Sequence, residues 1–215
     1  GDVYKRQVFT GTFASWKLKP LTKEYFLWFT LLSTGVFGFF ISTDLFTMFM
    51  FYEVALIPMY LLIGVWGSGR KEYAAMKLTL MLMGGSAFLL IGILGIYYGA
   101  GAETMNILEI VKHQIPTEMQ RIFFPMVFLG FGVLGALFPF HTWSPDGHAS
   151  APTAVSMLHA GVLMKLGGYG CFRIAMYLMP TGAAIWGDFF LVLTTISVVY
   201  GAFLSLIHIS EPTRP

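Results

Sequence analysis

Lys165 is a charged residue inside one of the most apolar stretches of the chain. It lies in the middle of the run Ala160-Gly-Val-Leu-Met-Lys-Leu-Gly-Gly-Tyr-Gly170. A lysine at a bilayer centre costs roughly 2.5–3.5 kcal/mol, so such a residue normally faces an opposite charge or a water-filled cavity. We therefore predict that Lys165 is buried and carries protons.

A second ionisable residue, Glu53, lies in another apolar run that begins at Leu45. With a helical rise of 1.5 Å per residue, Glu53 is about 12 Å from the start of that run. Pro58 lacks the N–H that would bond to the Val54 carbonyl, and a freed carbonyl beside a carboxylate is a place where water can bind. We predict that Glu53 exchanges protons or pairs with a lysine. The alternative is a glutamate that only hydrogen-bonds another helix.

Four further side chains are candidates for a proton relay. Lys77 opens an apolar run near a membrane face, where its ammonium could instead extend to the surface. Histidine titrates in the range needed for proton transfer, although loop histidines also serve as structural hydrogen-bonding groups. For His159 we keep two readings, a relay and a hydrogen-bonded polar residue. The four candidates are Lys77, His141, His148 and His159.

The composition identifies the class of protein. Hydrophobic residues make up 56% of the 215 residues, charged residues 11%, and the mean hydropathy is +0.72. Such a chain has too little polar surface for a soluble domain and belongs in the lipid bilayer. A single cysteine excludes a disulfide framework and any two-cysteine metal site. The net charge of +2 gives no electrostatic basis for nucleic-acid binding. We expect no metal and no cofactor in this chain.

The elements that must position these residues are membrane-spanning helices. A helix needs about 20 apolar residues to cross a bilayer, and the continuous apolar runs contradict the alternating pattern of a membrane β-barrel. The 152–179 run is longer than one crossing needs and carries a glycine cluster, which predicts a discontinuous helix near Lys165. We predict an all-α polytopic membrane protein with six spans, at 25–43, 45–66, 74–98, 122–140, 152–179 and 184–205.

Basic residues predict the orientation, because cytoplasmic connections are enriched in lysine and arginine. We place the segment before residue 25, the 67–73 loop and the 141–151 loop on the cytoplasmic side, and the acidic 99–121 connection opposite. The two ends, 1–7 and 205–215, resemble translated adapter sequence and are predicted to be non-native tails. The partial transmembrane proton-translocation domain is then 8–204, an internal fragment.

Five sequence segments together carry a family resemblance. The run Phe138-Pro-Phe-His-Thr-Trp-Ser-Pro-Asp-Gly-His148 is followed by Ala151-Pro-Thr-Ala and by the Lys165 run. Upstream stand Tyr52-Glu-Val-Ala-Leu-Ile-Pro-Met-Tyr60 and the 70–77 run. The combination resembles the antiporter-like subunits of respiratory complex I, of the M (chain 4) type, over about residues 16–204.

The resemblance implies a proton-translocating membrane subunit of an NADH:quinone oxidoreductase, with one antiporter-like half present here. It implies that Lys165 is the central proton-carrying lysine and that Glu53 pairs with a channel lysine. Flavin, iron–sulfur and quinone sites are then expected in partner subunits, and related membrane subunits and lipid are the neighbours. The expected location is the bacterial inner membrane. One departure is Leu134-Gly-Ala136, where many relatives carry Lys-x-Pro.

Three other functions remain open at this point. The protein could be a subunit of a cation/proton antiporter or membrane-bound hydrogenase, which shares the His-Thr-Trp-x-Pro-Asp element. It could be a haem- or quinone-binding redox protein using His141, His148 and His159, although two of these lie in a Pro-rich connection. It could be a passive structural subunit, for which buried Lys165 and Glu53 would be costly.

Overall fold

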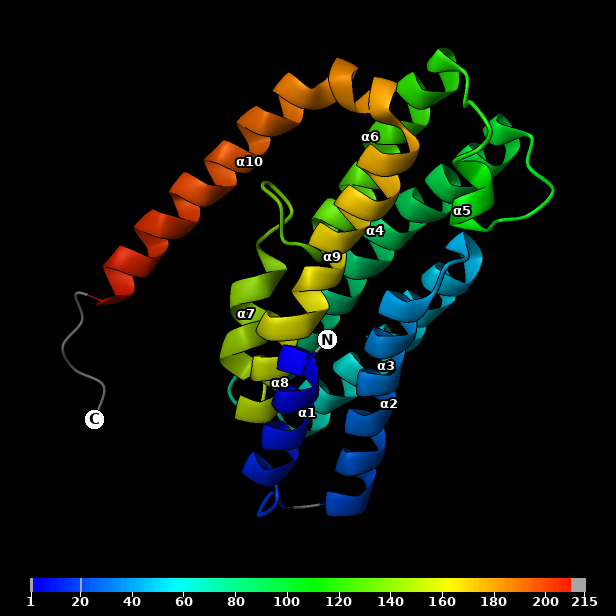
Figure 1. The fold of residues 1–215 in the computed structure, drawn as a ribbon. Coiled ribbons are helices and arrows are strands. Elements are labelled where there is room, and N and C mark those ends of the chain that lie inside the picture. Colours follow the sequence, from blue (N-terminus) through cyan, green and yellow to red (C-terminus); the bar gives the residue numbers. More distant parts are fainter. Residues whose placement is uncertain (1, 20, 210–215) are drawn as a thin grey trace.

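The computed structural model describes residues 2–19 and 21–209, which form a bundle of helices (Figure 1). Within these residues the only extended pairing is an antiparallel bridge between Asp44 and Asn106. Four helices are long and apolar enough to cross a membrane: α2 (Thr22–Ile41), α3 (Leu45–Trp66), α4 (Lys71–Ala100) and α10 (Pro180–Ile209). The all-α membrane fold is therefore confirmed, and each of these helices overlaps one of the expected spans.

The start of α3 is fixed by a cap and by a distant connection. The Asp44 carboxylate accepts a hydrogen bond from the Thr47 N–H at 2.9 Å, which satisfies one of the free donors of a helix start. The backbone N–H of Leu45 donates to the Met105 carbonyl. This second bond ties α3 to the connection that holds α5 (Ile107–Ile110), so the 99–121 segment is docked on the bundle.

The fourth expected span begins and ends earlier in the chain than predicted. Helix α6 runs from Thr117 to Leu134, whereas the sequence predicted a helix over 122–140. Ala136 adopts a left-handed conformation with φ 56°, and the Leu137 N–H folds back to the Gly132 carbonyl at 2.8 Å. These features end the helix because a residue in the left-handed conformation cannot continue a right-handed helix.

The predicted 141–151 loop is mostly helical, which corrects the sequence interpretation. It forms α7 (Trp143–Ser150), followed by α8 (Thr153–Leu158). Prolines suggested a helix-free connection, but Pro145 lies in the first turn of α7 and Pro152 is the N-cap of α8. A first-turn proline loses no helical hydrogen bond, because the N–H there has no partner within the helix.

The fifth expected span, 152–179, is divided, although not at its glycine cluster. The π-helical segments η1 (His159–Leu163) and η2 (Cys171–Met176) flank α9 (Met164–Gly170). The predicted discontinuity near Lys165 is therefore a local change of hydrogen bonding on both sides of it, and the glycine cluster itself is regular α-helix. Such π-turns are frequent at functional sites in helices.

The basic connections lie together at one end of the bundle. The Ser68 N–H donates to the Ser150 carbonyl at 2.8 Å, which joins the α3–α4 connection to the end of α7. The ring of Tyr25, at the start of α2, lies 5.5 Å from that of Trp66, at the end of α3. The grouping of these connections is confirmed, and the compartment that they face stays a prediction.

Helix α1 (Asp2–Ala14) was not expected from the sequence. It lies against α8, and at its other end the chain turns into α2 (Figure 1). The segment 1–7, predicted to be a non-native tail, overlaps the first turns of α1. The segment 205–215 partly continues α10, and residues 210–215 lie outside the described chain. The tail prediction is not tested by this arrangement.

Two neighbouring glycines of α9 have different roles, which gives a matched stability prediction. A Cβ at Gly167 would lie 2.5 Å from the Phe131 carbonyl oxygen on α6, whereas a Cβ at Gly168 would meet nothing within 4 Å. We expect Gly167→Ala to destabilise the fold by roughly 1–3 kcal/mol through overpacking. Gly168→Ala should be neutral or slightly stabilising, because alanine favours a helix more than glycine does.

Thermal unfolding in detergent checks this prediction. A lower melting temperature is expected for Gly167→Ala only, and equal melting temperatures for the two variants would show that α9 does not pack tightly on α6.

Candidate functional site

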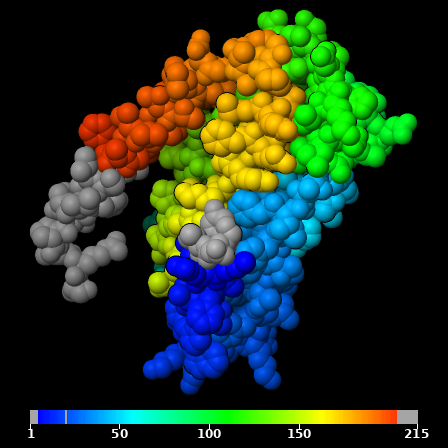
Figure 2. Space-filling view, in the orientation of Figure 1, coloured from blue at the N-terminus to red at the C-terminus, as the bar shows by residue number. Residues whose placement is uncertain are grey.

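Lys165 lies near the N-terminal end of α9 and lines a cavity of about 610 Å³. The walls come from α6, from the α9–η2 stretch and from α10, with Gly135, Tyr169 and Thr194 among the lining residues. The side chain of Lys165 is exposed, which corrects the prediction of a buried lysine. The reason is that α10 leans away from the bundle, with only 11% of its most apolar window buried (Figures 1 and 2).

Glu53 lies partly buried in the middle of α3. Its Oε1 atom is buried, and no hydrogen-bond partner for it lies in the part of the chain that the structure describes. No ion pair joins Glu53 to Lys165 or Lys77 among those residues, so the predicted pairing is not present in this structure.

Contacts between helices give the depth of Glu53 in the bundle. The neighbouring Tyr52 hydroxyl donates to the Leu82 carbonyl of α4 at 3.0 Å, which places this part of α3 level with Leu82. Lys77 precedes Leu82 by five residues, about 7.5 Å along the helix axis toward the basic end. A water molecule or a side-chain movement would be needed to connect Glu53 with Lys77.

Lys77 forms an ion pair that the sequence analysis missed. Its Nζ atom lies 2.6 Å from Asp146 Oδ2 on α7, with side-chain exposures of 23% and 43% for the two residues. The ammonium also lies 5.7 Å from the centre of the Tyr73 ring. Lys77 is therefore paired with a carboxylate on α7, and both the relay and the surface-extended interpretations of Lys77 stay predictions. The signal was present, because the Asp146 loop and the start of this helix were predicted to share one side.

His148 and His159 come together as a stacked pair. Their ring centroids are 4.2 Å apart with an interplanar angle of 22°, and Trp143 stacks on the His159 ring at 5.2 Å. His148 shares a hydrogen bond of 3.0 Å with the Ser156 hydroxyl, and burial lowers the pKa of His148. We call Lys77, Asp146, His148 and His159 the α7 cluster.

His159 is fully buried, and neither ring nitrogen has a hydrogen-bond partner among the described residues. This corrects the interpretation of His159 as a hydrogen-bonded polar residue. A buried ring with two unpaired nitrogens is costly unless water reaches it. The relay interpretation of His159 remains a prediction.

His141 lies next to the Lys165 cavity and apart from the α7 cluster. It lines a second cavity of about 180 Å³, which shares Ala136 and Ser197 with the walls of the first. Its ring stacks on Phe138 and meets the Tyr200 ring at 4.8 Å, and its Nδ1 atom is buried without a partner in the described chain. The structure thus gives two groups, Lys165 with His141 and the α7 cluster, with Glu53 separate from both.

Comparison with known proteins shows which protein family this chain belongs to. The sequence profile of the family described as NADH:quinone oxidoreductase/Mrp antiporter, transmembrane, matches residues 42–210. The chain belongs to this family. The match includes every candidate residue named above, from Glu53 to Lys165.

Named relatives and solved structures agree with this membership. The chain is 40% identical over 202 residues to chain 4 of the chloroplast NAD(P)H-quinone oxidoreductase of Citrus sinensis, covering 92% of this chain and 40% of the relative. It is 37% identical over 190 residues to subunit M of the NADH-quinone oxidoreductase of Rickettsia prowazekii. That alignment covers 88% of this chain and 38% of the relative. The chain therefore spans about two fifths of the length of these relatives.

Two respiratory membrane complexes contain chains of the same fold. In Thermus thermophilus complex I with bound NADH, the similar chain has a TM-score of 0.83 at 26% identity, covering 94% of this chain and 43% of that one. In an archaeal membrane-bound sulfane sulfur reductase, the similar chain has a TM-score of 0.84 at 26% identity. That alignment covers 92% of this chain and 41% of the reductase chain. The suspected resemblance to antiporter-like subunits of complex I is confirmed.

Within this antiporter-like family member, the haem alternative disagrees with the histidine geometry. A haem bound by two histidines lies between them, and the stacked rings of His148 and His159 leave no space for a macrocycle. His141 instead contacts Phe138 and Tyr200. Among the described residues, no group of three or more His, Cys, Asp or Glu side chains could hold a metal ion.

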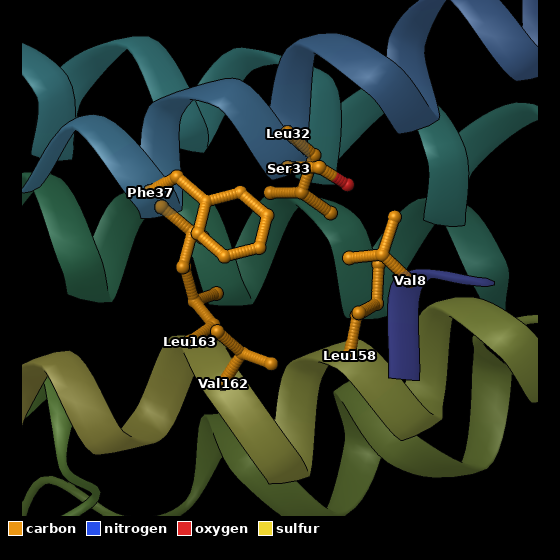
Figure 3. Close-up of a pocket in the computed structure, with 8 residues that line it drawn as sticks. Val8, Leu32, Ser33, Phe37, Leu158, Val162 and Leu163 are labelled. Atoms are coloured by element: carbon orange, nitrogen blue, oxygen red, sulfur yellow. The ribbon is translucent and has the colours of Figure 1, made fainter. Parts of the chain in front are cut away.

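A third, smaller cavity between α1, α2 and the η1 region has no chemical role (Figure 3). Its volume is about 10 Å³, and its walls are apolar apart from Ser33. The Ser33 hydroxyl donates to the Phe29 carbonyl at 2.9 Å, so its one hydrogen-bond donor is already used. The cavity is a small packing gap.

Proposed function

We propose that this chain is part of a proton-translocating membrane subunit of an NADH:quinone oxidoreductase. The observation that carries the proposal is Lys165, an ionisable residue on α9 between two π-helical segments, facing a cavity in a member of this family. A lysine at membrane depth beside space for water is suited to accept and release protons. Electron transfer is proposed to take place in partner subunits that hold the flavin, iron–sulfur and quinone sites.

The first proposed transfer lies between His141 and Lys165. Their cavities adjoin at Ala136 and Ser197, so water in both would connect the imidazole to the ammonium. The unpartnered Nδ1 of His141 supplies a proton donor or acceptor at one end. A charge on Lys165 disfavours a second charge nearby, so the two groups exchange one proton more readily than they hold two.

The second proposed pathway runs through the α7 cluster. Asp146 favours the protonated form of Lys77 as long as their ion pair is closed. When the pair opens, Lys77 can release its proton through water toward the stacked rings of His148 on α7 and His159 on η1. Glu53 contributes an unpaired carboxylate oxygen one or two helical turns further along the bundle. A proton entering on this side would reach Glu53 through water.

The proposed setting is a complex in the bacterial inner membrane. The named relatives include bacterial and chloroplast proteins, and the bacterial location fits the basic connections placed on the cytoplasmic side. The partners would be the other membrane subunits of the complex, including related antiporter-like subunits. Lipid would contact the exposed apolar faces.

A second candidate function is proton or cation transfer in a related respiratory complex. The equally close fold of the sulfane sulfur reductase chain favours it, as does the inclusion of Mrp antiporters in the family. Oxidation of NADH coupled to quinone reduction in the purified native complex distinguishes the two candidates. A complex that transfers cations without NADH oxidation would support the second.

A substitution of Lys77 tests the proposed function in the complete native complex. We expect Lys77→Met to lower NADH-driven acidification of vesicles by roughly tenfold or more, because a relay group is lost. The matched control is Lys112→Met, which removes a lysine from an exposed pair with Glu109 at the opposite end of the bundle. That control should pump normally.

Exchanging the charges of Lys77 and Asp146 distinguishes a role in proton transfer from a role in holding the fold. Lys77→Asp combined with Asp146→Lys rebuilds an ion pair between α4 and α7 but moves the amine. We expect assembly, seen on a native gel, to recover while acidification stays low. Normal acidification in Lys77→Met, or full recovery in the exchanged pair, would contradict a proton-carrying role for Lys77.

A further inference from the structure

The exposed face of α1 forms an ordered series from aromatic to basic residues. Phe9, Phe13 and Trp16 follow one another at helical spacing and are 65%, 61% and 68% exposed. Phe9 contacts Phe13 with ring centroids 4.9 Å apart, and Phe13 stacks on Trp16 at 6.3 Å. These three residues make one continuous apolar stripe, which we call the aromatic stripe.

The opposite side of α1 is packed against the bundle, which fixes the direction of this stripe. A Cβ at Gly11 would lie 3.0 Å from the Phe29 ring, and Val8 lines the packing gap against α2. The turn after α1 is held by a buried hydrogen bond of 2.8 Å between Ser15 and Tyr25. Figure 2 shows α1 at the front of the surface, at the lower end of the molecule.

Three lysines follow directly after the stripe. Lys17 and Lys19 lie in the α1–α2 connection and Lys23 in the first turn of α2, and all three are exposed. Glu24 is the acidic neighbour, so the local charge is +2 from three lysines and one glutamate. The lysines lie at the basic end of the bundle, beyond the end of the apolar stripe.

This order matches the order of groups in a phospholipid. In a bilayer this order would place Phe9 furthest into the membrane, Trp16 at the interface, where tryptophan is enriched, and the lysines at the depth of the headgroup phosphates. The stripe starts at Phe9, after the segment 1–7 that is predicted to be non-native. We propose that the aromatic stripe with Lys17, Lys19 and Lys23 is a binding site for an anionic phospholipid, with an acyl chain along the rings and the phosphate among the ammonium groups.

The proposed site is independent of proton transfer. Lysine binds phosphate as a point charge, and each basic residue near an anionic membrane surface contributes about a fivefold gain in binding. Charge complementarity favours phosphatidylglycerol over the zwitterionic phosphatidylcholine. A partner protein on this face would instead exclude both lipids.

Lipid quenching of Trp16 tests the proposal in the full chain. The chain is reconstituted in equal mixtures of phosphatidylglycerol and phosphatidylcholine, with bromine on the acyl chains of one lipid at a time. The Trp16 signal is the difference between the unmodified chain and Trp16→Phe. We expect brominated phosphatidylglycerol to quench it more, with a relative binding constant of about five or greater.

A triple variant and a matched control show whether the lysines cause the preference for phosphatidylglycerol. In Lys17→Gln/Lys19→Gln/Lys23→Gln the preference should fall to near one, and in Lys112→Gln/Arg121→Gln, at the opposite end, it should persist. High salt should weaken the preference of the unmodified chain, which tests the charge effect without any substitution. Equal quenching by the two lipids, or no quenching by either because protein covers the stripe, would overturn the proposal.

Discussion

Replacing Lys165 with methionine is expected to leave the complex assembled and to lower proton pumping by roughly a hundredfold or more. Methionine keeps an unbranched apolar chain on the cavity wall, so packing of α9 is retained, but no group remains that can carry the proton. Lys165→Arg should also fail, because a guanidinium does not release its proton in this range. The measurement is the initial rate of NADH-driven acidification in vesicles.

The control for Lys165 is Phe172→Leu. Phe172 lines the same cavity, is 70% exposed and carries no charge, so this substitution changes the wall without changing proton chemistry. We expect its acidification rate to stay close to that of the unmodified complex. Similar losses in Phe172→Leu and Lys165→Met would show that the cavity shape matters and that the charge does not.

The second large effect is expected for Glu53. Glu53→Gln keeps the size of the side chain and most of its hydrogen bonding, but it removes the charge and the titratable oxygen that is buried without a partner. We expect acidification to fall by about tenfold or more. Glu53→Asp should retain part of the activity, because the carboxylate survives at a slightly different position.

The matched control is Glu109→Gln, which removes an exposed carboxylate from the pair with Lys112. It should pump at the unmodified rate in an equally well assembled complex. Equal acidification by Glu53→Gln and the unmodified complex would make Glu53 a structural residue. Loss of assembly in Glu53→Gln but not in Glu109→Gln would point to the same conclusion.

The fold was predictable where long apolar runs determine it. The boundaries of α3 coincide with the predicted 45–66 span, and the grouping of the basic connections at one end is present in the structure. The hydropathy of the sequence predicts the bounds of a spanning helix because such a helix must be apolar along its whole length. Local backbone features were harder to predict from the sequence. The end of α6 depends on a left-handed Ala136, and alanine gives no sequence signal for that conformation.

The candidate site was predictable in its residue types and less so in its contacts. Lys77 was named as a candidate from the sequence, but its partner Asp146 lies on a helix that was not predicted because of its prolines. His148 and His159 were named separately, and only the folded α7 shows that they stack. Lys165 lies in a helix, as predicted, but it is exposed and not buried. Its exposure depends on the tilt of α10, which cannot be predicted from the residues around Lys165.

The most direct test of the central claim is the number of protons moved per NADH oxidised by the complete complex. The ratio is measured in sealed vesicles, with electron transfer and acidification recorded together for the unmodified protein and for Lys165→Met. We expect the ratio to drop clearly in the variant while the complex remains intact and electron transfer to quinone is still detectable. An unchanged ratio in assembled Lys165→Met would contradict the proposal that protons pass through this chain at Lys165.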